Sequence, residues 1–71
     1  MPLSNETLGD AFPKEQARVR EVLDIYKEIG PPGAFGAMMI EQTLRRADQA
    51  LISGDLIEMI AAYKEMQEVK A

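Results

Sequence analysis

The chain of 71 residues contains no cysteine, no histidine and no tryptophan. Without cysteine there is no disulfide and no thiolate to serve as a metal ligand or nucleophile. Without histidine the chain also lacks the commonest metal ligand and the commonest general base near neutral pH. The sequence indicates neither an activated serine nor a buried pair of carboxylates. We therefore expect a binding or assembly protein without a metal or cofactor, and not an enzyme.

Basic residues are also few: the chain has 8 Lys and Arg and 12 Asp and Glu, which gives a net charge of −4. Sequence-independent binding of nucleic acid needs clustered Lys and Arg, so we expect no nucleic-acid partner. No stretch reaches the length of a transmembrane span, and the first residues lack the basic-then-apolar order of a signal peptide. We expect a cytoplasmic protein with no membrane partner.

A chain of this size forms only a marginal hydrophobic core. Small proteins usually add disulfides, a metal or oligomerisation. Because the residues for the first two are missing, we expect a homodimer or a higher homo-oligomer.

The pattern of residues predicts an all-α fold with an N-terminal arm at residues 1–12 and a single three-helix domain at residues 13–71. Turn-favouring residues are frequent in the arm. A first helix should begin at Pro13, because proline suits the first helical position, and end at Ile29, because Gly30 and Pro31 follow. Its apolar stripe consists of Val19, Val22, Leu23, Tyr26 and Ile29.

The second helix is predicted at Ala34–Ser53, with a wide apolar arc. Its central positions are Ala37, Ile40, Leu44, Ala47 and Leu51, and Phe35, Met39, Thr43 and Ala50 lie beside them. A helix with so wide an arc packs against two neighbours, or against one neighbour and another chain.

Ser53-Gly54-Asp55 predicts the end of the second helix and the start of a third. Gly54 can adopt the left-handed conformation that ends a helix, and Asp55 can cap the next one in a capping box with Glu58. The third helix should run from Leu56 to near Val69, with a stripe formed by Leu56, Met59, Ile60, Tyr63 and Met66. The short connection predicts an antiparallel hairpin of the last two helices.

The first candidate site is a surface for a second copy or for a protein partner. We place Phe35, Met38, Met39 and Thr43 on it. Flexible thioethers suit adaptable partner surfaces, although methionine also fills ordinary small cores.

The second candidate is a site for a small anionic ligand. Gly30-Pro31-Pro32-Gly33 leaves the second helix without a side-chain cap, and free N–H groups near Gly33 and Gly36 could hold a phosphate or carboxylate. Arg45 or Arg46 from a neighbouring chain would add positive charge. The structural alternative is favoured: a rigid connection in which Gly36 leaves room for the first helix or a second chain. Likewise, the four arginines Arg18, Arg20, Arg45 and Arg46 are interpreted as part of a solvated face with nearby carboxylates.

The run from Ile29 to Leu51, about a third of the chain, resembles small uncharacterised proteins encoded by phages and prophages. More specifically, it is similar to phage proteins that sequester cyclic nucleotides and so blunt CBASS-type antiphage signalling. The resemblance rests on a helix that ends at a Pro-x-Gly-type turn and on Ile40-Glu41, Leu44 and Ala47–Leu51 in the next helix. It implies a phage accessory protein. This chain departs from the pattern in having a third helix after Gly54, and no ligand-binding residue is carried over.

Overall fold

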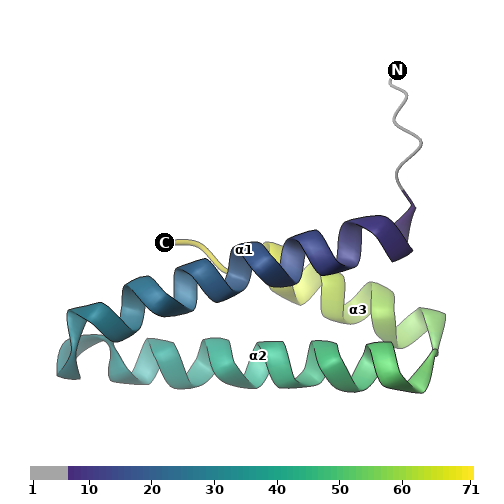
Figure 1. The fold of residues 1–71 in the computed structure, drawn as a ribbon. Coiled ribbons are helices and arrows are strands. Elements are labelled where there is room, and N and C mark those ends of the chain that lie inside the picture. Colours follow the sequence, from purple (N-terminus) through teal and green to yellow (C-terminus); the bar gives the residue numbers. More distant parts are fainter. Residues whose placement is uncertain (1–6) are drawn as a thin grey trace.

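The computed structural model describes residues 7–71, which form three α-helices and one short 3₁₀-helix (Figure 1). The elements are α1 (Leu8–Ile29), η1 (Pro31–Gly33), α2 (Ala34–Ser53) and α3 (Leu56–Gln67). Residues 7–71 contain no strand, so the predicted all-α fold with three helices is confirmed. The bounds of α2 are those that the sequence predicted.

The first helix begins at Leu8, and the predicted start at Pro13 is therefore wrong. Thr7 caps the helix, because its side chain accepts from the N–H of Asp10 while the Asp10 carboxylate accepts from the N–H of Thr7. This reciprocal pair satisfies two N–H groups that would otherwise have no partner. Pro13 consequently lies inside α1. The part of the predicted arm at residues 1–6 lies outside the described residues.

The hydrophobic core lies where the three helices meet, and small side chains make up much of it. Its buried members are Phe12, Val19, Val22, Leu23, Ala37, Ile40, Leu44, Ala47, Ala50, Ala62 and Met66. The α1 stripe and the centre of the α2 arc are thus largely confirmed. Phe12, which the sequence assigned to the arm, is fully buried and packs with its ring centroid 6.5 Å from that of Tyr63.

Four residues predicted in apolar stripes are instead exposed: Ile29 at the end of α1, and Leu51, Leu56 and Ile60 on α2 and α3. Every residue from Leu51 to Glu58 is exposed, so the connection between α2 and α3 extends beyond the core. A helical stripe is buried only where a neighbouring helix overlies it, and sequence periodicity does not record how far that neighbour reaches. The core contacts of α3 are made further along, by Met59, Ala62, Tyr63 and Met66.

The connection between α2 and α3 has the predicted left-handed glycine and side-chain cap, but not the predicted capping box. Gly54 has φ 70°, which ends α2, and the Asp55 side chain accepts from the N–H groups of Ile57 and Glu58. The N–H of Asp55 donates to Ser53 Oγ at 3.1 Å, whereas the predicted capping box would direct it to the Glu58 carboxylate. Local hydrogen bonds therefore define the turn.

Candidate interaction surface

The junction between α1 and α2 is a tight connection stabilised by its own backbone. Gly30 has φ 85° and donates its N–H to the carbonyl of Lys27 at 3.1 Å. Its carbonyl accepts from the N–H of Gly33 at 2.8 Å, and the N–H of Ala34 donates to the carbonyl of Pro31. The 3₁₀ turn thus engages two N–H groups at the point where α2 begins, although α2 has no side-chain cap.

Gly33 and Gly36 are required because α1 lies against them. A Cβ atom on Gly33 would lie 2.4 Å from the backbone oxygen of Tyr26, and one on Gly36 would lie 2.5 Å from the Tyr26 ring. Distances this short are impossible for real atoms, so the two glycines allow the start of α2 to pack on Tyr26. This is the structural role that the sequence favoured for Gly36, and Tyr26 is the residue that occupies the space.

The four residues of the predicted anion site do not come together within one chain. Gly36 and Arg46 lie on α2 ten positions apart, which is about 15 Å along a helix. Arg46 pairs with the carboxylate of Glu65. Arg45 lines a shallow hollow of about 320 Å³ with Arg20, Glu41 and Asp48, in which Glu41 pairs with Lys27 at 3.3 Å and Asp48 accepts from Gln16 at 2.9 Å. Whether a second chain completes such a site stays a prediction.

Four large apolar side chains are exposed around this junction, and we call them the junction patch: Ile29, Phe35, Met38 and Met39. Phe35 is 70% exposed, and the other three are about half-exposed. Together the exposed fractions equal about two whole side chains. Aromatic and methionine side chains are enriched in the cores of protein interfaces. Three of the four predicted surface residues therefore do lie at the surface.

The fourth, Thr43, is only 7% exposed and lies between α2 and α3. Its Oγ1 lies 2.8 Å from Glu65 Oε2 and donates to that carboxylate, and it is also 3.2 Å from the carbonyl oxygen of Met39. The hydrogen bond from Arg46, and secondarily that from Thr43, lower the pKa of Glu65 below its ordinary value. Thr43 thus holds α3 against α2 and is not available to a partner.

A groove of about 390 Å³ adjoins the junction patch, and we call it the junction groove. It is lined by Tyr26, Gly36, Met39, Ile40, Glu68, Val69 and Lys70. One wall is therefore formed by α1 and α2, and the other by the segment after α3. The Tyr26 hydroxyl donates to the carbonyl of Lys70 at 3.4 Å and links the two walls. This groove was not predicted from the sequence, because the residues after Gln67 carry no pattern that places them beside α2.

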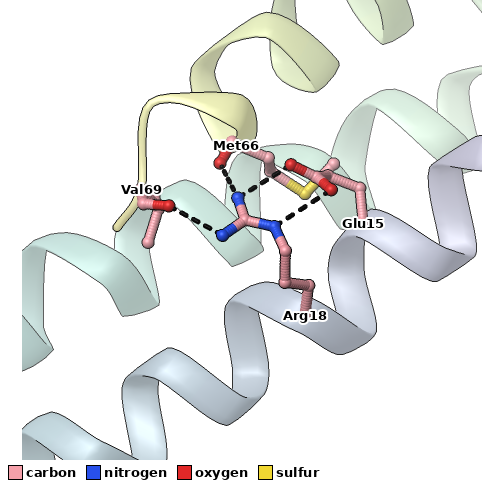
Figure 2. Close-up of polar contacts among 4 residues, drawn as sticks. All are labelled: Glu15, Arg18, Met66 and Val69. Atoms are coloured by element: carbon pink, nitrogen blue, oxygen red, sulfur yellow. Dashed lines mark hydrogen bonds and ion pairs between the residues drawn. The ribbon is translucent and has the colours of Figure 1, made fainter. Parts of the chain in front are cut away.

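Arg18 holds the C-terminal wall in place (Figure 2). Its guanidinium donates to the carbonyl of Met66 at 2.8 Å and to that of Val69 at 2.9 Å. The Met66 carbonyl also accepts from the N–H of Val69 at 3.0 Å, so Arg18 adds a charged donor to the last turn of α3. Glu15 orients the guanidinium through two hydrogen bonds, at 2.8 and 3.1 Å, and the hydrogen bond to Glu15 raises the pKa of Arg18 above its ordinary value.

The contact of Arg18 with α3 corrects its interpretation as a residue of a solvated face. The i, i+3 pairing of Glu15 with Arg18 was visible in the sequence. The contact with the end of α3 depends on the tertiary fold and gave no sequence signal.

A second exposed apolar surface lies at the other end of α2, and we call it the turn patch: Leu51, Ile52, Leu56, Ile57 and Ile60. Ile52 is 85% and Ile57 79% exposed, and the five exposed fractions together equal about three whole side chains. Its members are branched aliphatic residues, and the acidic Asp55 and Glu58 lie among them in the sequence. This surface was not predicted from the sequence, because three of its members were assigned to helical stripes.

No family model, no curated protein and no solved structure matches this chain. Within residues 7–71, none of the helices combines the length and the apolar character needed to cross a membrane. That same part of the chain holds no group of three or more acidic side chains placed to bind a metal ion. The assignment of a function therefore depends on the two apolar surfaces and the groove.

Proposed function

We propose that this protein is a non-enzymatic interaction and assembly module that acts as a homo-oligomer in the cytoplasm, with the junction patch as its contact surface. The observation that carries the proposal is the exposure of Phe35 beside an apolar groove. Aromatic side chains that enter pockets supply much of the binding energy at protein interfaces. Tyr26 and Met39 offer such a pocket next to Phe35.

The size of the junction patch is consistent with association of moderate strength. Burying the equivalent of two whole apolar side chains contributes about 3–6 kcal/mol per chain, or about 6–12 kcal/mol for a symmetric pair. The loss of translational and rotational freedom costs about 4–15 kcal/mol. The free energy gained by burying the patch is therefore close to the cost of association, and contacts in the groove would decide the affinity.

The arrangement of helices supports this role. We propose that α2 and α3 form an antiparallel hairpin, since Arg46 and Thr43 of α2 both contact Glu65 of α3 and Gly54 reverses the chain. Such a hairpin leaves the start of α2 uncovered by α3 and free to meet another copy. The resemblance of residues 29–51 to phage proteins supports the further proposal of a phage or prophage accessory protein.

Sedimentation equilibrium of the full chain tests the oligomer. We expect a concentration-dependent shift from one chain to two or more at micromolar concentration. A single species with the 7.9 kDa mass of one chain at all concentrations up to the millimolar range would contradict the proposal.

The alternative is a binder of a small anion or cyclic nucleotide at the start of α2. Its support is the absence of a side-chain cap on α2 together with the resemblance. A thermal-shift panel of nucleotides and cyclic nucleotides tests it, with Arg45→Ala as the variant that should lose the response. No shift of the melting temperature with any nucleotide would reject this alternative.

A further inference from the structure

The junction patch and the junction groove are neighbours in the sequence as well as in space. Phe35 and Gly36 are consecutive residues at the start of α2, and Gly36 lines the groove while Phe35 projects outside it. Phe35 is not among the residues that line the groove and is 70% exposed, so its ring does not fill the groove of its own chain. A protruding ring and a receptive groove therefore lie on one surface without filling one another.

The lining of the groove suits an aromatic ring. The Tyr26 ring packs directly on Gly36, and this ring and the Met39 thioether both line the groove. Thioether and aromatic groups attract one another, and ring pairs prefer offset or edge-to-face contacts. A volume of about 390 Å³ also falls in the range of about 300–1,000 Å³ that accepts whole small ligands. One phenyl ring with part of its neighbouring chain fits within it.

We infer that two copies of this chain form a two-fold dimer in which Phe35 of each copy inserts into the junction groove of the other. This inference rests on the proposed homo-oligomer and names its contact. A two-fold axis makes each contact twice, so a surface that carries both the ring and the groove is complementary to itself. The groove also carries one acidic and one basic side chain, Glu68 and Lys70, so these two side chains bring no net charge to the contact.

The turn patch is less suited to contact with a second copy. Its exposed residues are aliphatic, and Asp55 and Glu58 lie among them. A two-fold axis through this patch would bring those like charges together, which is unfavourable. The second copy is therefore assigned to the junction end of the molecule.

The first experiment measures the dimer dissociation constant of the full chain by sedimentation equilibrium. Phe35→Ala should raise that constant by roughly two to three orders of magnitude, because each dimer loses two aromatic anchors. Ile52→Ala is the matched control: it removes a more exposed apolar side chain from the turn patch and should leave the constant within about threefold of the unsubstituted chain. Circular dichroism verifies that both variants stay helical.

The second experiment separates insertion from simple contact between patches. Met39→Glu places a charge on the wall of the groove but keeps Phe35, whereas Phe35→Ala keeps the groove but removes the ring. Each variant alone should be monomeric at a concentration where the unsubstituted chain is dimeric. Mixed together, they should form a heterodimer with one ring in one intact groove, detected by native mass spectrometry with one variant isotope-labelled.

The outcomes distinguish the two proposals. A monomeric unsubstituted chain overturns both the homo-oligomer and the insertion. A dimer that Phe35→Ala does not weaken overturns the insertion only, and loss of that dimer in Ile52→Ala assigns the contact to the turn patch. If Phe35→Ala weakens the dimer but the two variants do not form a heterodimer, Phe35 contacts a surface other than the groove, and the insertion is again overturned.

Discussion

The two ends of α2 are built on different physical principles. At the junction with α1, two glycines let Tyr26 approach the backbone of α2, and the segment after α3 closes the other side of a groove. At the turn to α3, Gly54 and Asp55 make a locally satisfied connection that extends beyond the core. Close packing of α1 on α2 thus forms one wall of a groove beside Phe35, whereas the well-capped turn exposes every residue from Leu51 to Glu58. Both ends expose apolar side chains, but only the junction end offers both a projecting ring and a groove to receive it.

The largest effects are expected from replacing the glycine at each end of α2. Gly33→Ala places a Cβ atom 2.4 Å from the Tyr26 backbone oxygen, which cannot move without shifting α1. We expect the free energy of unfolding to fall by an amount near the upper end of the usual overpacking cost of about 1–3 kcal/mol. Urea denaturation followed by circular dichroism measures it.

Gly54→Ala is the partner of that test. A Cβ atom there meets nothing within 4 Å, so the cost is only that of a left-handed conformation, about 1–2 kcal/mol. A larger loss in Gly54→Ala than in Gly33→Ala would contradict the view that tertiary packing governs the junction while local conformation governs the turn.

A smaller effect is expected from Arg18→Ala, which removes the donors at the end of α3. We expect a loss of about 1 kcal/mol, because a charged hydrogen-bond donor typically contributes about 1.5–3 kcal/mol and this side chain is 40% exposed. Hydrogen exchange should quicken in the last turn of α3 and leave the N–H groups near Asp55 unchanged. Arg20→Ala, at an exposed position on α1, is the control. Equal quickening at both ends of α3 would show that Arg18 supports the whole helix and not the groove wall.

The smallest expected effect is a dependence of stability on acid pH through Glu65. Its pKa is lowered from the ordinary value of 4.5, first by the hydrogen bond from Arg46. The ionised group therefore stabilises the fold fully above pH 4.5, and this contribution disappears as the pH falls through the lower, folded-state pKa. Glu65→Gln should flatten the loss of stability below pH 4.5 in thermal melts, whereas Glu28→Gln on the exposed side of α1 should not. Parallel profiles for Glu65→Gln and the unsubstituted chain would refute this assignment.

Features that depend on residues close in the sequence were predicted more accurately than features that depend on distant ones. The bounds of α2 were predicted because Gly33 and Gly54 mark its two ends, and the cap at Asp55 followed from side-chain chemistry alone. The start of α1 was placed too late, at Pro13, although Thr7 and Asp10 carry a capping pattern at the right spacing. Proline at the first helical position is a common signal, and here it competed with the cap and misled the prediction.

The candidate site was predicted in part. Helical angles along α2 were sufficient to indicate that Phe35, Met38 and Met39 lie outside its central seam. They also placed Thr43 at the surface, because the sequence does not record that Glu65 lies opposite it. The groove could not be predicted, since Tyr26, Met39 and Val69 come from three separate segments.

By itself, the sequence determined an acidic, all-helical chain of three helices, with glycine or a capping side chain at both ends of α2 and at the start of α3. These features depend on contacts within a few residues, and sequence patterns report such contacts directly. Only the tertiary structure decided which apolar residues are buried, what fills the space at Gly33 and Gly36, and where a groove opens beside Phe35. These features depend on which helices pack against one another and over what length. Packing across the whole core decides both.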